Sequence, residues 1–300
     1  MNTEKIEILS VDLLDQHRAR ADSLRQLAHS LRIEFGWHYL LDIVWILEHL
    51  DEHLGDFDGR RISDAGAGVG LMQWYLAQNN ATVISIDRSG RETLPLFYRA
   101  RYRIEGLRSE DLASPFSTLV NGMLTTPGVR SRIGRVIRDL IAIPCIASTS
   151  RQKGSVLICN QDLKDLREIP DDSLDAVVAV SALEHNPPED LHAVVNELMR
   201  TIKKGGVLLA TLGAAREHDW YHEPSCGWNY TASSLRRYFS LKDDVPSNYD
   251  NHDVLFEALR TCEELSENLA RFYFLSGDNG MPWGKWAPKY QPVGVVKIKH

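Results

Sequence analysis

The sequence predicts an α/β protein with a mostly parallel sheet, and three observations point to this class. Residues 61–88 read as a strand, a glycine-rich turn, a helix and a second strand. Residues 175–211 repeat the order of strand, helix and strand, with a pair of glycines before the last strand. The strands are short, apolar and bounded by turn residues, which is typical of strands joined by crossover helices.

The glycine-rich turn lies at the carboxyl end of the first strand. It follows Asp64, and its three glycines alternate with other residues. Because glycine has no Cβ atom, the backbone can turn tightly here and come close to a ligand. The glycines are Gly66, Gly68 and Gly70.

The segment after the turn completes half of a nucleotide-binding α/β unit. Residues 71–78 are expected to form a helix, and residues 82–86 a β-branched strand that ends on Asp87. The dinucleotide-binding pattern G-x-G-x-x-G, counted from Gly66, requires a small residue where Leu71 stands. A pyrophosphate site is therefore not indicated.

An acidic residue followed by G-x-G-x-G resembles the motif of the class I S-adenosylmethionine-dependent methyltransferases. In that family the carboxylate at the end of the second strand binds the ribose hydroxyls, and Asp87 occupies this place. The third strand is expected over residues 155–160. In the family, the acid after this strand accepts a hydrogen bond from the adenine amine. Asp162 occupies this place, and Leu163 would cover the adenine ring. The resemblance implies S-adenosylmethionine as cofactor, S-adenosylhomocysteine as product, and contacts from Asp64, Ala65, Gly66, Gly68, Gly70, Asp87, Arg88, Asp162, Leu163, Ser181 and Trp37.

The family pattern continues with a strand, a Glu-His pair, a helix, a glycine pair and a strand, all present in this order. They are residues 175–181, Glu184-His185, residues 189–201, Gly205-Gly206 and residues 207–211. The resemblance covers residues 61–213 and implies a Rossmann-like, doubly wound sheet of seven strands, mostly parallel with an antiparallel last strand. Residues 1–300 are expected to form a single methyltransferase domain.

Three segments lie outside this pattern. Residues 1–60 are expected to be helical. Residues 88–153 form an insertion, because they exceed the length that a crossover helix needs. Residues 214–292 are the substrate-side segment, and its residues 265–275 would form the sixth strand. The last strand follows over residues 292–299.

The insertion is positively charged in an acidic chain. It holds twelve Lys or Arg and five acidic residues, a net charge of +7, while the whole chain carries −7. Its most regular part is an amphipathic helix with an apolar stripe over 133–141, arginines elsewhere around the wheel, and Pro144 as the expected end. Such a helix suits a lid docked on the core, a peripheral membrane contact through 130–147, or recognition of a phosphate-bearing substrate.

The candidate catalytic residues are His185, His222 and Tyr221. His185 is the best placed general base, because the carboxyl ends of the strands face the crevice in this architecture. In many resembling enzymes, however, this histidine only shapes the cofactor pocket. Fourteen of the 25 aromatic residues fall in the last 85 residues, where they would line a substrate pocket or pack in the core.

A metal site is not expected. Four residues of the substrate-side segment have suitable types and spacing, but loop histidines near a substrate more often form hydrogen bonds. These are Glu217, His218, His222 and Cys226. The four cysteines include no C-x-x-C pair, so neither a disulfide framework nor a structural zinc site is indicated.

Composition places the chain among ordinary globular proteins, with 43% hydrophobic and 25% charged residues. Neither a membrane-spanning run nor an export signal is recognised, so a cytoplasmic location is expected. The formal charge of −7 argues against general nucleic-acid binding.

The leading hypothesis is methyl transfer to an oxygen or nitrogen atom of a small molecule, such as a sugar, lipid or natural-product intermediate. One alternative is an RNA or protein methyltransferase that docks through the basic insertion. Another is a cofactor-binding regulatory or scaffold protein without turnover. The identity of the acceptor is expected to be encoded in the insertion and in the aromatic segment after Gly213.

Overall fold

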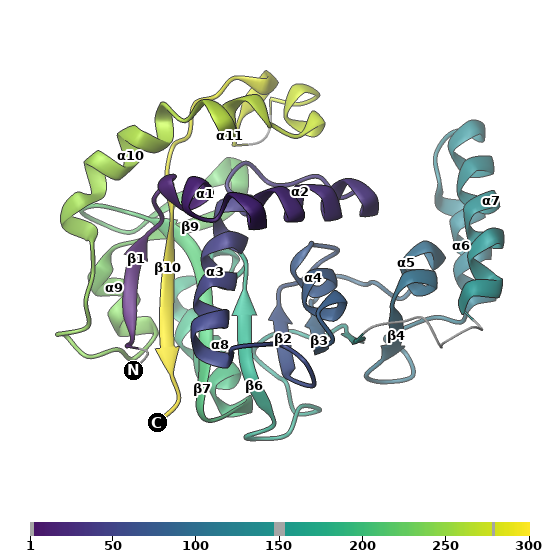
Figure 1. Ribbon diagram of the computed structural model, residues 1–300, viewed down its shortest axis with the longest axis horizontal. Coiled ribbons are helices and arrows are strands. Elements are labelled where there is room, and N and C mark those ends of the chain that lie inside the picture. The colour runs from purple at the N-terminus through teal and green to yellow at the C-terminus, as the bar shows by residue number, and fades with distance from the viewer. Residues whose placement is uncertain (1–2, 147–153, 278–279) are drawn as a thin grey trace. The chain divides into compact units, whose positions relative to one another are not determined.

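The computed structural model describes residues 3–146, 154–277 and 280–300, and it divides into two compact units. The central unit is Phe57–Glu168. The split unit combines Met1–Asp56 with Ile169–His300. Figure 1 labels the elements of both.

The central unit is a parallel sheet with helices, and it contains the glycine-rich turn. The strands lie in the order β2, β3, β5, β4, and all their pairings are parallel. The strands are β2 (Arg61–Ala65), β3 (Thr82–Ile86), β4 (Arg103–Gly106) and β5 (Ser155–Cys159). The helices are α4 (Met72–Gln78), α5 (Leu96–Arg101), α6 (Pro115–Thr125) and α7 (Val129–Ile146).

An aromatic cluster joins the first two helices of the central unit. Trp74 on α4 is fully buried and stacks on Tyr98 of α5, with ring centroids 4.8 Å apart. Tyr102, just after α5, covers the same indole at 5.1 Å. Burial of rings of this size contributes roughly 1.5–3 kcal/mol each. The cluster therefore fixes α5 and the start of the insertion against the α4 side of the sheet.

After α5 and β4, the insertion folds into a helical hairpin made of α6 and α7. Arg99 on α5 ties α6 in place, because its guanidinium donates to the Ala113 carbonyl at 2.7 Å and to the Thr118 hydroxyl at 3.1 Å. The expectation that Pro144 ends the second helix is wrong, since α7 continues to Ile146. A proline in the last turn removes one hydrogen bond near a frayed end, which the helix tolerates. Residues 147–153 of the insertion lie outside the described residues.

The split unit carries the antiparallel part of the fold. The strands β1, β10, β7 and β6 lie in this order; β6 is parallel to β7, whereas β10 is antiparallel to both β7 and β1. β9 extends parallel to the end of β7 and pairs with β8. The strands are β1 (Lys5–Ile8), β6 (Leu174–Ala179), β7 (Ile202–Ala214), β8 (Trp220–His222), β9 (Gly227–Tyr230) and β10 (Gln291–Ile298).

Helices of the split unit pack against its strands. α3 contacts β7 and β10, and α8 contacts β7. A Cβ atom at Gly294 of β10 would lie 2.3 Å from the Trp45 ring, so a glycine is needed for α3 to sit this close. The helices are α1 (Asp12–Gln16), α2 (Arg18–Leu31), α3 (Tyr39–Leu54), α8 (Pro188–Thr201), α9 (Ala232–Tyr238), α10 (His252–Arg260) and α11 (Glu263–Glu267).

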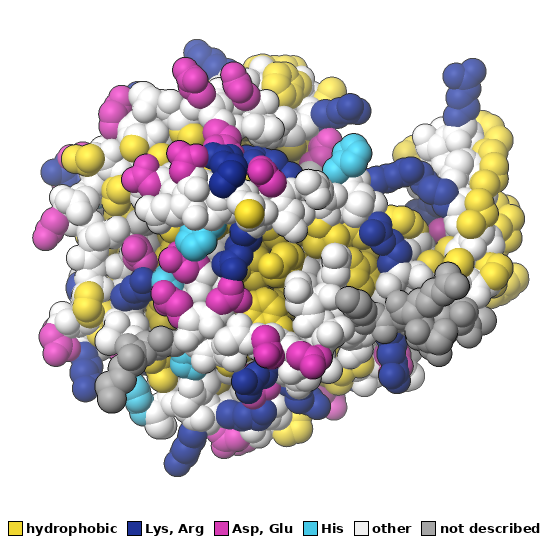
Figure 2. All heavy atoms as spheres, viewed as in Figure 1, with side chains coloured by type: hydrophobic (Ala, Val, Ile, Leu, Met, Phe, Trp, Pro, Cys, Tyr) yellow, Lys and Arg dark blue, Asp and Glu magenta, His cyan; other side chains and the backbone are white. Residues whose placement is uncertain are grey.

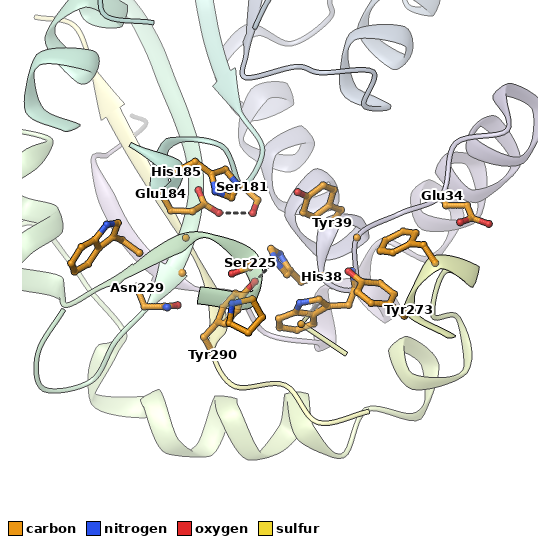
Figure 3. Close-up of a pocket in the computed structure, with 18 residues that line it drawn as sticks. Glu34, His38, Tyr39, Ser181, Glu184, His185, Ser225, Asn229, Tyr273 and Tyr290 are labelled. Atoms are coloured by element: carbon orange, nitrogen blue, oxygen red, sulfur yellow. Dashed lines mark hydrogen bonds between the residues drawn. The ribbon is translucent and has the colours of Figure 1, made fainter. Parts of the chain in front are cut away.

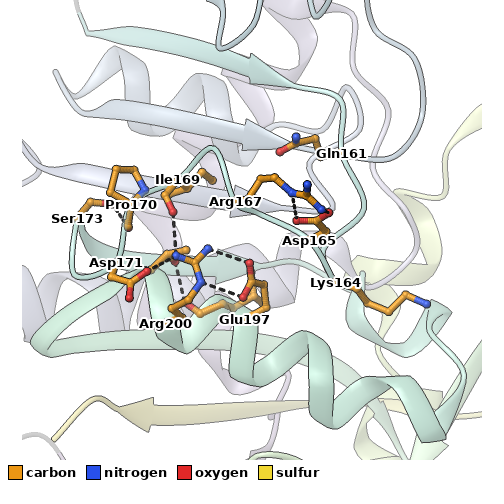
Figure 4. A network of polar contacts seen from close by, with 12 residues as sticks. Gln161, Lys164, Asp165, Arg167, Ile169, Pro170, Asp171, Ser173, Glu197 and Arg200 are labelled. Atoms are coloured by element: carbon orange, nitrogen blue, oxygen red, sulfur yellow. Dashed lines mark hydrogen bonds and ion pairs between the residues drawn. The ribbon is translucent and has the colours of Figure 1, made fainter.

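A polar network holds the last turn of α8 against the loop before β6 (Figure 4). Arg200 donates two hydrogen bonds to Glu197, at 2.8 and 2.9 Å, and one to the Ile169 carbonyl at 3.0 Å. It also pairs with Asp171. The fork geometry of the guanidinium makes such paired contacts directional.

The sheet is mostly parallel with an antiparallel strand at its C-terminal end, as predicted, but its described strands number ten rather than seven. The sixth strand expected over 265–275 is wrong, because this stretch forms α11 and a 3-10 turn over Arg271–Phe274. Four strands were not predicted, namely β1, β4, β8 and β9. They are three or four residues long and depend on pairing with distant segments.

No helix in the described part of the chain is long and apolar enough to cross a membrane.

Candidate functional site

The glycine-rich turn of the central unit adopts backbone conformations that favour glycine. Gly66 and Gly68 have φ values of 75° and 48°. A Cβ atom at Gly70 would lie 3.0 Å from the Ala67 carbonyl oxygen, which accepts a hydrogen bond from the Gly70 N–H at 2.8 Å. The turn is therefore compact and presents main-chain atoms rather than side chains.

Asp87, at the carboxyl end of β3, is bonded to this turn. Its Oδ2 accepts a hydrogen bond from the Gly68 N–H at 2.8 Å, and its Oδ1 accepts from the Ser89 N–H at 2.7 Å and from the Ser89 hydroxyl at 2.5 Å. Partial burial would raise the pKa of Asp87, but the hydrogen bonds from Ser89 and Gly68 outweigh it and lower the pKa. The side chain is thus an ionised acceptor at the strand end.

Arg91 is buried behind the turn and connects it to two strands. Its guanidinium donates to the Gly68 carbonyl at 3.1 Å, the Ser85 carbonyl at 2.8 Å and the Cys159 carbonyl at 3.1 Å. Burial raises the pKa of Asp64 to about 7, although the positive charge of Arg91 opposes this shift. Arg91 was not predicted as a site residue, and its only sequence signal is a cation four residues after the strand-end acid Asp87.

Gln73 on α4 closes the turn from the other side. Its amide nitrogen lies 3.1 Å from the Gly70 carbonyl, and its Oε1 accepts from the Ser85 hydroxyl at 2.7 Å. The side chain is fully buried. Sequence reasoning did not single out this residue, because a glutamine within an amphipathic helix normally faces solvent.

The other predicted cofactor contacts of the central unit differ in exposure. Ala65 is buried at the end of β2, and Arg88 is exposed. Asp162 is exposed after β5, and its Oδ1 accepts from the Lys164 N–H at 2.9 Å, while Leu163 is half-buried. The hydrogen bond to residue 164 is a local turn contact that leaves the second oxygen of Asp162 accessible. The roles of these four residues stay predictions.

The split unit contains a pocket of about 310 Å³. Figure 3 shows its lining side chains. They come from the loop before α3, the 3-10 turn Leu183–His185, the strand β9 and the C-terminal segment. They include Trp37, Tyr39, Ser181, Glu184, His185, Asn229, Tyr273 and Tyr290. The two predicted cofactor contacts of this unit, Trp37 and Ser181, are both among them.

Ser181 and Glu184 form a bonded pair on one side of the pocket. Ser181 has a φ of 45°, which is unfavourable for a residue with a side chain and is often found at functional sites. Its N–H donates to the Thr211 hydroxyl at 3.0 Å, and its own hydroxyl donates to Glu184 Oε1 at 2.5 Å. Burial raises the pKa of Glu184, and the charge of His185 and the Ser181 hydroxyl offset part of the shift.

His38 and Asp42 form a second buried pair, of which His38 lines the pocket. His38 Nδ1 donates to Asp42 Oδ2 at 2.6 Å, and its Nε2 lies 3.5 Å from the Tyr290 hydroxyl. Burial raises the pKa of Asp42, while the His38 side chain opposes this. A carboxylate that orients a histidine is a recurrent arrangement in acid–base sites. The sequence signal for this pair is an aspartate four residues after a histidine in an apolar helix, because this spacing places both side chains on one helix face.

The three predicted catalytic residues lie in different surroundings. His185 lines the pocket, and its Nδ1 donates to the Cys226 carbonyl at 2.9 Å. His222 does not line this pocket but lies behind it, with its ring 5.3 Å from that of Tyr290 and its Nδ1 2.8 Å from the Ser225 hydroxyl. Tyr221 is exposed and absent from the lining. The structure thus brings only His185 into the pocket.

Among the described residues, no group of three or more His, Cys, Asp or Glu side chains is arranged to hold a metal ion. The spacing of Glu217, His218, His222 and Cys226 therefore does not produce a cluster.

Comparisons with known proteins show similarity to methyltransferases. A family profile described as a methyltransferase domain matches residues 142–210. No curated protein matches the sequence. The solved structure of the [4+2]-cyclase SpnF is 17% identical, with 88% of this chain and 84% of that chain covered and a TM-score of 0.49. A putative sarcosine dimethylglycine methyltransferase from Galdieria sulphuraria is 13% identical, with 93% and 98% covered and a TM-score of 0.47. YcgJ from Bacillus subtilis is 14% identical, with 85% and 97% covered and a TM-score of 0.44.

The profile match indicates a methyltransferase domain over residues 142–210. The acidic G-x-G-x-G turn and the mostly parallel α/β sheet agree with the class I S-adenosylmethionine-dependent type of this domain. S-adenosylmethionine is the cofactor of this class. The similar solved structures are too remote to identify an acceptor.

Proposed function

We propose that the protein transfers a methyl group from S-adenosylmethionine to an oxygen or nitrogen atom of a small molecule. The observation that carries this proposal is a hydrogen bond between the glycine-rich turn and Asp87. The Gly68 N–H donates it to Asp87 Oδ2 at 2.8 Å. The geometry fits the cofactor, because an ionised carboxylate beside open main-chain atoms suits a ribose diol next to a glycine-rich backbone.

The chain's residues have separate tasks in this proposal. Asp87 accepts hydrogen bonds from the ribose hydroxyls, Asp162 from the adenine amine, and Leu163 covers the ring. When bound, S-adenosylmethionine supplies an electrophilic methyl group. The protein's contribution is to position the acceptor and exclude water, and positioning of this kind can lower a barrier by roughly 7–11 kcal/mol.

We assign the acceptor to the pocket of the split unit. The pocket has aromatic walls and a few convergent polar groups, which is typical of small-molecule sites. His185 is the candidate general base among the three residues expected from sequence, since it alone lines the pocket. His38, oriented by Asp42, is a second candidate that the structure supplies.

The α6–α7 hairpin favours contact with an anionic lipid surface. Ten of its apolar side chains are exposed, among them Leu124 at 75% and Ile141 at 67%. Figure 2 shows hydrophobic side chains gathered along this hairpin. Three arginines of α7 are also exposed, and apolar and basic residues on one hairpin suit the boundary of an anionic membrane. They are Arg130, Arg132 and Arg138.

The test of the proposed function is transfer of a labelled methyl group. The purified protein is incubated with labelled S-adenosylmethionine and a fractionated metabolite extract, and labelled products are identified by mass spectrometry. Label in a small molecule is expected. Label found only in RNA or protein would support the alternative that the basic insertion docks a macromolecule, and binding of the cofactor without any transfer would favour a scaffold role.

A further inference from the structure

Two buried oxygen atoms of the pocket have no hydrogen-bond partner in the described part of the chain. They are Glu184 Oε2 and Asn229 Oδ1, and the two residues are only 5% and 1% exposed. Buried oxygens of this kind are nearly always paired, because a buried polar atom without a partner loses the hydrogen bonds that it made to water. Both residues line the same pocket. A ligand in the pocket that donates hydrogen bonds would pair these oxygens.

Close packing fixes these two oxygens in place. A Cβ atom at Gly213 would lie 2.1 Å from Asn229 Oδ1, and one at Gly227 would lie 3.2 Å from the Glu184 side chain. The hydroxyl of Ser181 holds the other oxygen of Glu184 at 2.5 Å. Two glycines and the Ser181 hydroxyl thus hold the side chains of Glu184 and Asn229 in position. Such preorganisation is expected of a binding site.

The charge of the pocket selects the kind of donor. The described lining residues include two acidic side chains, the buried Glu184 and the exposed Glu34, and neither Lys nor Arg. A phenolate, carboxylate or phosphate would meet acidic groups and oxygen acceptors here without a cation to offset its charge. A positively charged hydrogen-bond donor would instead be attracted by these acidic side chains and oxygen acceptors.

The walls of the pocket suit an organic cation. Indole and phenol rings line the same pocket as Glu184. The Trp37 ring lies 5.2 Å from that of Tyr290, and the main-chain N–H of Trp37 donates to the Tyr273 hydroxyl at 3.0 Å. Aromatic faces attract ammonium groups, and the attraction is stronger when water is excluded. The volume of about 310 Å³ accommodates a small molecule.

We propose, on the basis of the methyl-transfer function above, that the acceptor is a small organic amine, bound as its ammonium through Glu184 Oε2 and Asn229 Oδ1. An ammonium offers two or three N–H donors, enough in number for both oxygens, whereas an alcohol offers one. Methylation requires a free electron pair on nitrogen. One ammonium proton passes to Glu184, which leaves a neutral amine beside a carboxylic acid with the total charge and proton count unchanged.

The experiment compares three probes of similar shape without any cofactor. Phenethylamine, 2-phenylethanol and 3-phenylpropionate are titrated into the full chain by calorimetry. The amine is expected to bind about tenfold or more tightly than the alcohol, and the carboxylate weakest. Equal or tighter binding of the alcohol or the carboxylate would overturn the proposal, and this comparison needs no variant.

Two matched variants localise the effect. Glu184→Gln keeps the size of the side chain and its acceptor for the Ser181 hydroxyl, and it should weaken amine binding about tenfold while leaving the alcohol unchanged. Glu34→Gln changes an exposed acid of the same pocket and should alter amine binding less than threefold, about 0.65 kcal/mol. Identical amine affinity in Glu184→Gln and the parent protein would refute the role of Glu184.

S-adenosylmethionine titrations on the same samples separate this proposal from the one it rests on. Cofactor binding that Asp87→Ala weakens, together with amines that do not bind, would retain the methyl-transfer function and discard the amine. Amine binding without any cofactor binding would discard the methyl-transfer function instead.

Discussion

The main-chain N–H of Gly68 donates a 2.8 Å hydrogen bond to Oδ2 of Asp87, so that the glycine-rich turn after β2 and the acid after β3 form one unit. The two residues are 19 positions apart in the sequence. The parallel pairing of β2 with β3 brings their carboxyl ends to the same edge of the sheet. Asp87 therefore both shapes the turn and presents an ionised carboxylate beside it.

Replacement of Asp87 by alanine should weaken S-adenosylmethionine binding about tenfold or more, because the ribose hydroxyls lose a charged acceptor. The measurement is isothermal titration calorimetry. Asp243→Ala removes an exposed acid from a loop of the split unit and serves as the control, with affinity expected to be unchanged. Equal affinities in the two variants would contradict the assigned role of Asp87.

Replacement of Gly68 by alanine should cost about 1–2 kcal/mol of unfolding free energy, because its φ of 48° is unfavourable for a residue with a Cβ atom. The added methyl would lie 3.8 Å from Asp87 Oδ2, so strain rather than a clash causes the loss. Urea denaturation measures it. Gly134→Ala is the matched control, since its Cβ would meet no atom within 4 Å and a helical alanine should stabilise by about 0.5–1 kcal/mol. Similar effects at both sites would argue against backbone strain.

The stability of the protein should depend on pH through Asp64. Burial raises its pKa from 3.8 to about 7, so the native state binds more protons than the unfolded state between these values. The stability that this group contributes is present below pH 4 and is lost as the pH rises toward 7. Asp64→Asn should remove this pH-dependent loss of stability. The unfolding free energy of the variant, measured relative to that of the parent protein, should therefore increase by roughly 1–3 kcal/mol between pH 4 and pH 8. Parallel curves of unfolding free energy against pH would show that Asp64 is ionised in the native state.

The α6–α7 hairpin should bind vesicles that contain about 30% anionic lipid, with weaker binding at high salt because its arginines contribute by charge. Leu124→Glu combined with Ile141→Glu should abolish co-sedimentation. Val254→Glu changes an equally exposed apolar residue, 73% exposed on α10, and should not affect it. Binding that persists in the double variant would show that the apolar face of the hairpin does not carry the lipid contact.

Most elements of the central unit were predictable from sequence, because their signals are local. The apolar strands β2, β3 and β5 and the helix α4 lie within two residues of their expected positions. Glycine spacing alone indicated the turn, since only glycine adopts the backbone conformations of Gly66 and Gly68 without strain. The strand-end acid was equally visible, whereas Arg91 and Gln73 were not, because their contacts come from other elements.

The C-terminal part of the chain was less predictable. The apolar spacing of residues 265–275 suits either a strand or short helical turns, and the surrounding contacts selected the turns. The edge strand β1 is four residues long and exists through its pairing with β10, almost 300 residues away. Short strands of this kind gain most of their stability from a distant partner.

The sequence by itself predicted the α/β fold and the methyltransferase resemblance, because the glycine-rich turn and the strand-end acid are each encoded within a few residues. Only the tertiary structure decided which polar groups share a pocket. It buried Glu184 and Asn229, which line the same pocket, and it joined His38 to Asp42 by a hydrogen bond. It left Tyr221 and His222 out of the lining of this pocket. The reason is physical: burial and hydrogen-bond satisfaction depend on packing between segments far apart in the chain, which no local pattern records.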